Sequence, residues 1–226
     1  SDLFCSKSFF MDAHRSPSAI RKEYMRHRLT EGEVSADPFH LFGLWWQEAI
    51  NAEIEEVNAM TLATASPAGV PSARIVLLKG YDERGFVFFT NYESFKGREL
   101  QENPRACLVF FWKELERQVR ITGLAAKVSP QESDEYFHSR PEASRIGAWV
   151  SPQSQVIPGR EWLEKREGEL MESFRNGELT RPPHWGGYRG KPVSIEFWQG
   201  RPNRLHDRLH YQLEENGGWK LERLAP

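Results

Sequence analysis

The stretch Ala59–Thr90 reads AMTLATASPAGVPSARIVLLKGYDERGFVFFT and decides the expected fold. Three runs within it are rich in aliphatic and aromatic residues, and each is a predicted strand: Ala59–Ala65, Ala73–Leu78 and Phe86–Thr90. The segments Gly69-Val70-Pro71 and Asp82–Gly85 between them are typical of turns. Because the connections are short, these strands are predicted to form an antiparallel meander or barrel rather than a parallel βαβ sheet.

The rest of the chain extends this pattern. Further strands are predicted at Ala106–Trp112, Gln118–Thr122, Val193–Trp198, Leu209–Leu213 and Trp219–Leu224. Helices are predicted at Phe39–Ile50, after an Asp37-Pro38 cap, and at Ser94–Asn103, Pro130–Ser139 and Glu161–Phe174. We therefore predict a mainly β protein with flanking helices, organised as a flexible tail, residues 1–20, and a single domain, residues 21–226.

Composition limits the classes of function. The chain of 226 residues has 30 Lys+Arg and 32 Asp+Glu, and its net charge of -2 gives no overall attraction to nucleic acid. No apolar run approaches the ~20 residues that span a bilayer, and Ser1–Phe10 lacks the apolar core of a secretory signal. The two cysteines, Cys5 and Cys107, are more simply explained as isolated thiols in a reducing compartment than as a disulfide. These observations predict a cytoplasmic protein that binds neither nucleic acid nor a membrane.

A polar cluster near the C-terminus is the first candidate site. Glu196–Arg208 reads EFWQGRPNRLHDR, in which a predicted strand leads into a turn rich in charge. Guanidinium groups bind phosphate or carboxylate, an indole offers an aromatic wall, and an imidazole titrates near neutral pH. The cluster therefore predicts a site for an anionic, aromatic ligand, although a lone histidine such as His206 is often structural.

Two basic motifs predict phosphate binding. Strand alternation places Arg74 and Lys79 on opposite faces unless a bulge intervenes, so one could serve a cofactor and the other a substrate. A strand whose charged ends reach water has the same pattern. Ser94 is the expected N-cap of a helix that contains Lys96 and Arg98, and the N-terminus of a helix is a ready phosphate site.

A third motif carries hydroxyl and guanidinium groups. Tyr136 and Arg140 lie on one face at the end of a predicted helix, and Ser144 follows the break at Pro141. They could form a phosphate cradle, although a cation at a helix C-terminus is favourable without any ligand. The loop Trp149–Ser154 offers an amide and a hydroxyl to a flat heterocycle. Sequence patterns typical of metal sites, dinucleotide folds, Walker A loops and nucleophile elbows are absent.

Taken together, these segments resemble the pyridoxamine 5'-phosphate oxidase family from about Arg21 to the last residue. The segments that carry the resemblance keep the family's order: Arg74–Lys79, Phe88–Asn91, Glu116–Val119, Tyr136–Pro141, Arg145–Ser151, Gln153-Ser154, Trp185–Gly187, Glu196–Gly200, Arg204–Arg208 and Glu222–Pro226. The resemblance implies an FMN-binding split β-barrel, antiparallel and Greek-key-like, that forms a homodimer with FMN at the interface. It implies oxidation of pyridoxine 5'-phosphate or pyridoxamine 5'-phosphate to pyridoxal 5'-phosphate, by hydride transfer from substrate C4′ to flavin N5, with O2 reduced to hydrogen peroxide.

By position, the resemblance also implies the site residues. Those for FMN are Arg74, Ile75, Val76, Leu77, Leu78, Lys79, Phe89, Thr90 and Lys96, with Gln118, Gln153, Ser154, Trp198 and Arg208 supplied by the partner subunit. Those for substrate are Lys79, Tyr136, Arg140 and Ser144 at the phosphate, Arg204, Leu205 and His206 over the ring, and Arg21 and Tyr24 in a segment that closes over the site. Arg204 and His206 are the expected catalytic residues, either orienting the substrate or moving a proton.

One departure from the family concerns the cofactor phosphate. Relatives usually read Ser-Arg-Lys where this chain has Ser94-Phe95-Lys96, so Phe95 removes a guanidinium. Loss of such a charge-assisted contact costs about 1.5–3 kcal/mol, or about one to two decades in affinity, unless Arg98 replaces it. We therefore predict weaker FMN retention than in a relative with arginine at this position.

Two other classes of function remain open. A split barrel could hold flavin or pyridoxal phosphate without turnover, although the nearly complete set of substrate residues argues against this. Nucleic-acid binding through aromatic and basic residues conflicts with the net charge of -2. Bound FMN together with peroxide production from pyridoxine 5'-phosphate would distinguish the oxidase from both.

Overall fold

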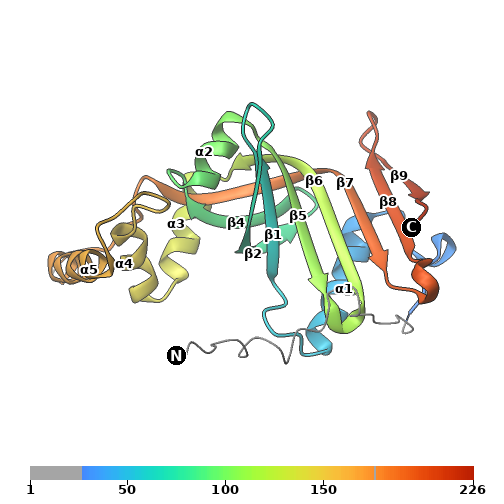
Figure 1. Cartoon of the computed structure of the whole chain (residues 1–226), viewed down its shortest axis with the longest axis horizontal. Helices are drawn as coiled ribbons and strands as arrows, with labels where there is room; N and C mark the ends of the chain where they lie inside the picture. The colour runs from blue at the N-terminus through green and yellow to red at the C-terminus, as the bar shows by residue number, and fades with distance from the viewer. Residues whose placement is uncertain (1–26, 176) are drawn as a thin grey trace, which may run out of the picture.

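A curled antiparallel sheet forms the body of the computed structural model, which describes residues 27–175 and 177–226 (Figure 1). Its strands, within those residues, are β1 (Ala59–Ala65), β2 (Pro71–Leu77), β3 (Gly80–Asp82), β4 (Gly85–Asn91), β5 (Arg105–Trp112), β6 (Arg117–Lys127), β7 (Trp185–Gln199), β8 (Asp207–Leu213) and β9 (Trp219–Arg223). The helices are α1 (Pro38–Asn51), α2 (Phe95–Glu102), α3 (Pro130–Ser139), α4 (Glu142–Val150) and α5 (Arg160–Phe174), with short 3-10 turns η2 (Glu31–Glu33), η3 (Lys113–Leu115) and η4 (Pro202–Arg204). The predicted tail and the predicted substrate residues Arg21 and Tyr24 lie outside the described residues.

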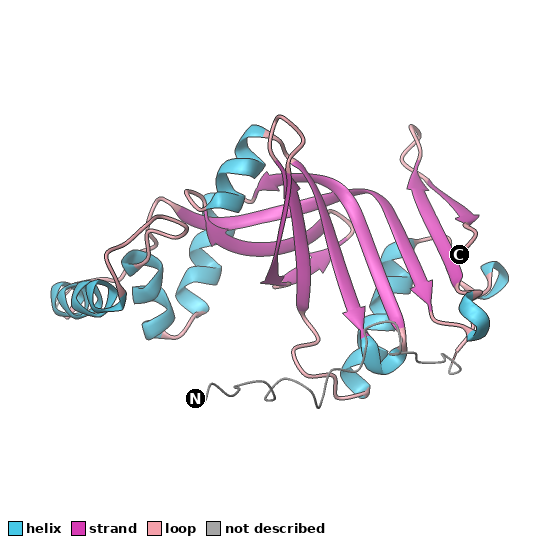
Figure 2. Ribbon diagram, viewed as in Figure 1, coloured by secondary structure: helices cyan, strands magenta, loops and turns pink. Residues whose placement is uncertain are grey.

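Strand β7 pairs with three other strands, β4, β6 and β8. The order is β2-β1-β5-β6-β7-β4-β3, and β8 and β9 extend the sheet from β7. The first part of β7 pairs with β4, where Tyr188 lies opposite Phe88, and its last part pairs with both β6 and β8. Figure 2 shows α3, α4 and α5 on one side of the molecule and β8 and β9 on the opposite side. The predicted fold class, mainly β with flanking helices and an antiparallel sheet, is confirmed, and the sheet curls into a half-barrel.

Helix α1 packs against the sheet through its aromatic residues. The Asp37 carboxylate accepts a hydrogen bond from the Phe39 N–H at 2.9 Å, and Pro38 occupies the first turn. Phe42 is fully buried, and its ring centroid lies 4.9 Å from that of Phe86. The predicted cap and the predicted helix are therefore both confirmed.

The structure extends β7 beyond its predicted start, from residue 193 back to residue 185. The glycines in this part hide the alternation of a strand. A Cβ on Gly186 would lie 2.1 Å from the Tyr92 hydroxyl, and one on Gly187 would lie 2.6 Å from Val128 Cγ2. Close packing therefore requires glycine where a strand would otherwise show apolar side chains.

The sequence does not predict helix α4, because Pro141 indicates a break and Trp149–Ser154 indicates a loop. Instead Pro141 is the N-cap of α4, and the helix continues to Val150. Ile146 and Val150 are buried in a second core that also contains Phe137 of α3. Tertiary packing thus stabilises a helix in this short segment, although the local sequence does not predict one.

Candidate active site

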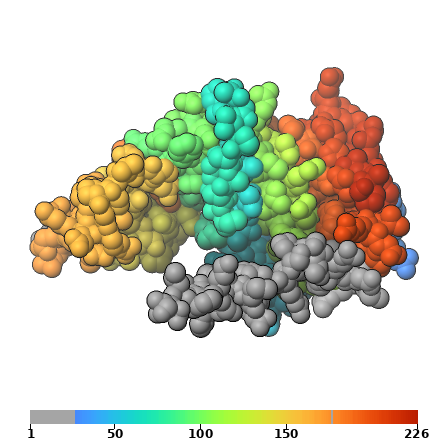
Figure 3. All heavy atoms as spheres, in the orientation of Figure 1, coloured from blue at the N-terminus to red at the C-terminus, as the bar shows by residue number. Residues whose placement is uncertain are grey.

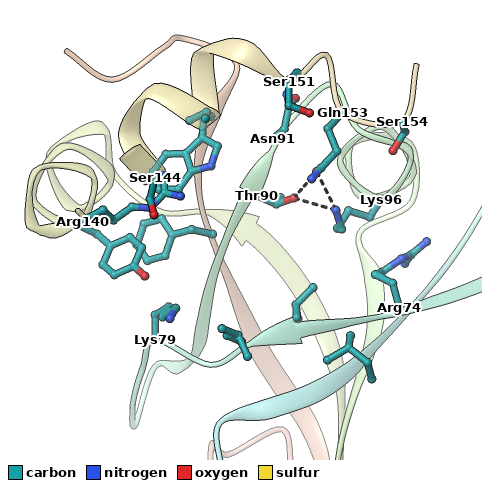
Figure 4. Close-up of a pocket in the computed structure, with 18 of the residues that line it drawn as sticks. Arg74, Lys79, Thr90, Asn91, Lys96, Arg140, Ser144, Ser151, Gln153 and Ser154 are labelled. Atoms are coloured by element: carbon teal, nitrogen blue, oxygen red, sulfur yellow. Dashed lines mark hydrogen bonds between the residues drawn. The ribbon is translucent and has the colours of Figure 1, made fainter. Parts of the chain in front are cut away.

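A cavity of about 900 Å³ opens among β2, β4, α2, α3, α4 and the loop after α4 (Figure 4). Many of the predicted cofactor and substrate residues line it: Arg74, Ile75, Val76, Leu77, Lys79, Phe89, Thr90, Lys96, Tyr136, Arg140, Ser144, Gln153 and Ser154. Its volume lies in the range of small-molecule sites in proteins, ~300–1,000 Å³. Four parts of the chain, residues 74–79, 89–96 and 136–154 and Trp185, therefore converge on one site.

Arg74 is held on one side of the cavity by buried polar groups. Its Nη2 donates to Ser72 Oγ at 2.6 Å and lies 3.3 Å from Glu99 Oε2, while Nη1 donates to Thr64 Oγ1. Burial disfavours the Glu99 carboxylate, but hydrogen bonds from Thr64, Ser72 and Arg74 outweigh that and lower its pKa. The guanidinium is therefore fixed in place before any ligand binds.

Lys96 lies near Arg74 and is held by the loop after α4. Its Nζ donates to Thr90 Oγ1 at 3.1 Å and to Gln153 Oε1 at 3.0 Å. The Phe95 N–H, in the first turn of α2, donates to Ser154 Oγ at 3.1 Å. Burial, and then the charge of Arg74, lower the pKa of Lys96. An anion here would meet an ammonium group, two hydroxyls and an amide.

Gln153 and Ser154 thus line the cavity of their own chain. The resemblance assigned both residues to the partner subunit. The hydrogen bonds from Lys96 and from the Phe95 N–H place them instead beside α2 of the same chain. No partner is needed to bring these two residues to this cavity.

Phe95 presents its ring to solvent at the cavity, with 55% of the residue exposed. Arg98 does not replace the missing guanidinium in the structure. It donates to the Glu93 carbonyl at 2.8 Å, lies over the Phe95 ring and is not among the cavity-lining residues. In this arrangement Arg98 therefore does not compensate for the guanidinium that is missing at Phe95.

The opposite side of the cavity combines an aromatic stack with a second pair of cations, Lys79 and Arg140. Tyr136 stacks on Phe89 at 4.0 Å between ring centroids, and the Arg140 guanidinium lies 4.6 Å from the centre of the Trp185 ring. Burial lowers the pKa of Arg140, and its Nη1 is buried without a hydrogen-bond partner. Because buried donors are nearly always paired, this atom points to a ligand.

Arg74 and Lys79 line the same cavity, contrary to the prediction that they face opposite sides of a strand. Strand β2 ends at Leu77, so alternation does not extend to Lys79. The Leu78 N–H donates to Asn58, and the Lys79 N–H donates to Val87 of β4. Leu78, a predicted flavin contact, is 4% exposed and belongs to the core rather than to the cavity lining.

The remaining predicted residues lie away from this cavity. Gln118, Trp198 and Arg208 are direct neighbours across β6, β7 and β8, and we call them the outer row. Arg208 Nε donates to Glu196 Oε1 at 2.8 Å. Arg204, Leu205 and His206 lie in and beside the η4 turn, and none of these six predicted residues lines the cavity.

His206 packs beside the outer row. Its ring centroid is 4.6 Å from that of Trp198, and its Nδ1 accepts a hydrogen bond from the Arg201 N–H at 3.0 Å. Burial, and then the nearby charge of Arg204, lower the pKa of His206. The imidazole is therefore biased toward its neutral form, with the proton on Nε2.

The cavity and the outer row are separated by the length of β7. Trp185 lines the cavity and Trp198 belongs to the outer row, 13 residues further along the same strand. At ~3.3 Å per residue this is about 43 Å of strand. Figure 3, whose horizontal direction is the longest axis, likewise shows α3–α5 and the β8–β9 region at opposite ends. A single chain therefore does not bring these two groups around one small ligand.

The sequence missed several contributors to the site, among them Glu99, Gly147 and Trp185, whose ring lies against the Arg140 guanidinium. The Glu99 carboxylate pairs with the Arg74 guanidinium. The sequence shows Glu99 only as an acidic residue in a predicted helix that also contains Lys96 and Arg98. Gly147 of α4 lines the cavity, and a Cβ there would meet nothing within 4 Å. In residues 27–175 and 177–226, no cluster of three or more His, Cys, Asp or Glu residues could hold a metal. No helix in that part of the chain is long and apolar enough to cross a membrane.

Comparison with known proteins gives a consistent result along the chain. Residues 46–169 match a family model described as pyridoxamine 5'-phosphate oxidase, and residues 185–226 match one described as the pyridoxine 5'-phosphate oxidase C-terminal dimerisation region. A pyridoxine/pyridoxamine 5'-phosphate oxidase of Polynucleobacter asymbioticus is 60% identical over 93% of this chain and 99% of its own length. One of Bordetella pertussis is 59% identical over 93% of this chain and 100% of its own.

Solved structures show the same architecture. PhzG from Burkholderia lata, in complex with tetrahydrophenazine-1-carboxylic acid, has a TM-score of 0.82 and 34% identity, covering 88% of this chain and 98% of its own. An FMN-binding protein of Nostoc punctiforme, at 19% identity, covers 85% of this chain and 100% of its own, and its TM-score of 0.67 shows the shared fold. By its family models and its close relatives, the chain belongs to the pyridoxamine 5'-phosphate oxidase family.

Proposed function

We propose that this protein is an FMN-dependent oxidase that converts pyridoxine 5'-phosphate or pyridoxamine 5'-phosphate to pyridoxal 5'-phosphate and reduces O2 to hydrogen peroxide. The names of curated relatives at 60% and 59% identity support the substrate class. The match covers 99% or more of the length of both relatives. The cytoplasmic location expected from the sequence stays a prediction.

The observation that carries this proposal is the charge of the cavity. Among the described residues that line it, four are cationic, Arg74, Lys79, Lys96 and Arg140, and none is acidic. Figure 4 shows Arg74 and Lys96 on one side and Lys79 and Arg140 on the other. Two separate pairs of cations suit two phosphate groups, one of a cofactor and one of a substrate.

The residues on the Arg74 side fit FMN. Lys96, Thr90 and Ser154 offer an ammonium group and two hydroxyls to a phosphate, with Arg74 beside them. Ile75, 65% exposed although apolar, provides surface that a flavin ring would cover. When bound, FMN supplies the two-electron chemistry and the reaction with O2.

The Lys79 side is the proposed substrate-phosphate site. Arg140 Nη1 lacks a partner, and a phosphate oxygen would satisfy it. Lys79 and Ser144 lie on this side, and Tyr136, whose ring centre is 5.9 Å from Lys79 Nζ, lines the cavity beside them, so all three would supply further donors. Because Tyr136, Arg140 and Ser144 are positioned by helices α3 and α4, they would orient the substrate as well as bind it.

In the proposed homodimer, the outer row and the η4 turn of each subunit complete the cavity of the other. The match of residues 185–226 to a dimerisation region supports a dimer. The separation of the two groups along β7 supports their contribution from different subunits. Arg204 and His206 would then orient the pyridine ring, and with Nδ1 accepting from the Arg201 N–H, His206 Nε2 is the ring nitrogen that carries the proton.

Aerobic turnover tests the proposal directly. Flavin released from the denatured protein should be FMN, and the intact protein with pyridoxine 5'-phosphate should form pyridoxal 5'-phosphate and peroxide in equal amounts. Bound FMN without peroxide would favour a binding protein, and absence of FMN would count against the cofactor. A reduced phenazine carboxylic acid is the control for substrate class, because PhzG shares the fold. If Arg204→Ala and His206→Ala both leave kcat/KM unchanged, their assignment is wrong.

A further inference from the structure

The η4 turn needs to be held by its surroundings. Asn203 and Arg204 have φ angles of 55° and 62°, in the left-handed region that residues other than glycine seldom adopt. Arg204 is exposed, and Leu205 after it is 69% exposed. Such a backbone persists only where neighbouring groups determine it.

Residues that precede and follow the η4 turn contact each other across it. The Arg201 N–H donates to His206 Nδ1, and Arg201 Nε lies 3.5 Å from Asp207 Oδ2. Arg201 therefore contacts both the imidazole and the residue that follows it. The orientation of His206 depends on where Asp207 is held.

Asp207 is held by a segment from the other end of the chain. Its Oδ2 accepts a hydrogen bond from the Leu29 N–H at 3.1 Å, and its Oδ1 accepts one from Arg223 Nη1 at 2.8 Å. Arg223 Nη2 donates to the Leu29 carbonyl at 2.8 Å. Both backbone groups of Leu29 are thus bound, and its side chain is buried in the core at 6% exposure.

Two further contacts complete this arrangement. Arg223 forms a two-pronged ion pair with Glu31, with Nε 2.6 Å from Oε1 and Nη2 2.9 Å from Oε2. Arg201 Nη1 donates to the His27 carbonyl at 3.1 Å. Hydrogen bonds from Arg223 lower the pKa of Glu31 to about 2, so its charge is present at any pH used for assay.

We propose that Arg201, Asp207 and Arg223 are positioning residues that orient the turn carrying Arg204 and His206 by anchoring it to the backbone of residues 27–31. This inference rests on the proposed function, because it concerns the residues assigned there to the substrate ring. Arg223 contacts Asp207, Leu29 and Glu31 at once, so its loss should release the segment and the turn together. Its effect on catalysis passes through His206 and Arg204 and not through the cavity.

Substitution Arg223→Gln tests this in the full-length, FMN-loaded protein. We expect the KM for pyridoxine 5'-phosphate to rise about tenfold, the change produced by losing a hydrogen bond to a charged group, while the Kd for FMN stays unchanged. Trypsin cleavage after Arg28 should accelerate by a similar factor, because Leu29 must leave the core for that bond to be cut. Lys220→Gln on the same strand, which breaks only an exposed pair with Glu222, is the matched control and should change neither quantity.

Glu31→Gln provides a second variant if Arg223→Gln does not fold. It removes the pair with Arg223 but leaves the bond to Asp207, so we expect faster cleavage after Arg28 with a smaller rise in KM. Faster cleavage with KM unchanged in Arg223→Gln would overturn the proposal, since the anchor would then hold the segment but not the turn. Unchanged cleavage would overturn it as well. Absence of turnover in the wild-type protein would instead refute the proposed function, and the cleavage assay does not depend on turnover.

Discussion

The cavity and the outer row lie at opposite ends of β7 and are stabilised by different means. In the cavity, Arg74 is fixed by the buried Glu99 carboxylate and by hydroxyl groups. Near the outer row, the η4 turn depends on Arg223, whose side chain is 37% exposed. Exposed ion pairs contribute little individually, whereas a buried charge must be paired to be retained. The difference indicates that the cationic groups of the cavity are fixed before an anion binds, whereas the η4 turn depends on contacts with neighbouring segments of the chain.

The largest expected effect is at the unpartnered guanidinium of the cavity. Arg140→Met should raise the KM for pyridoxine 5'-phosphate about 100-fold, the upper end for loss of charge-assisted hydrogen bonds. Steady-state kinetics measure this. The Kd for FMN should not change, because Arg140 lies on the Lys79 side of the cavity.

The thermal stability of Arg140→Met gives an independent control. Arg140 is only partly buried, and its buried Nη1 has no partner, so an apolar residue of similar length removes a desolvated, unpaired group. The melting temperature of the cofactor-free protein should therefore not fall. A marked fall together with the loss of activity would assign Arg140 a structural role and remove the argument from its unpartnered Nη1.

A mixing experiment tests whether the two regions serve one site from different subunits. Arg140→Met damages the cavity, and His206→Ala damages the region of the outer row. When the two variants are unfolded together and refolded at equal concentration, half of the dimers are mixed, and each mixed dimer has one intact site. With substrate well below the wild-type KM, activity should recover to about a quarter of the wild-type value, from about 1% for either variant alone.

The alternative outcome is equally definite. If the cavity and the η4 turn of the same chain formed one site, every site in a mixed dimer would carry one damaged group. Activity would then stay at the level of the single variants. That result would refute the intersubunit arrangement and leave the separation along β7 unexplained.

A gain of affinity is expected at Phe95. Phe95→Arg places a guanidinium in the first turn of α2, beside Lys96 and Ser154. The Kd for FMN, measured by quenching of flavin fluorescence, should fall by about one to two decades. Phe95→Leu is the control, because it removes the ring without adding charge. If both variants bind FMN equally well, the ring of Phe95 rather than the missing charge determines the affinity.

The sequence predicted most of the fold because its strands are short, alternating and separated by turn residues. It failed at Gly186 and Gly187, where close packing removes the side chains that would reveal a strand. It also misjudged Lys79, because alternation along β2 could not show that the strand ends at Leu77 and that the chain then pairs with β4. The role of Glu99 depends on a contact across 25 residues, which no local pattern reveals.

The smallest expected effect is the pH dependence of FMN binding. The pKa of Lys96 lies below its ordinary value of 10.5, owing to burial and then to Arg74. As the pH rises toward that lowered pKa, below 10.5, Lys96 loses its charge and the Kd for FMN should increase, although Arg74 keeps its charge and limits the change. Isothermal titration at several pH values measures this. In Lys96→Arg the dependence should disappear, because arginine stays protonated.

Deprotonation of Lys96 has the opposite effect on the stability of the cofactor-free protein. Because the pKa of Lys96 is lower in the folded than in the unfolded state, the unfolded chain binds more protons between the two values. The contribution of Lys96 to the free energy of unfolding therefore increases as the pH rises through this window, while FMN binding weakens. Urea titrations of the cofactor-free protein, compared with Lys96→Arg, should show this difference. If stability and FMN affinity instead fall together in the wild-type protein and in Lys96→Arg alike, another group titrates, and the burial of Lys96 does not govern the Arg74 side of the cavity.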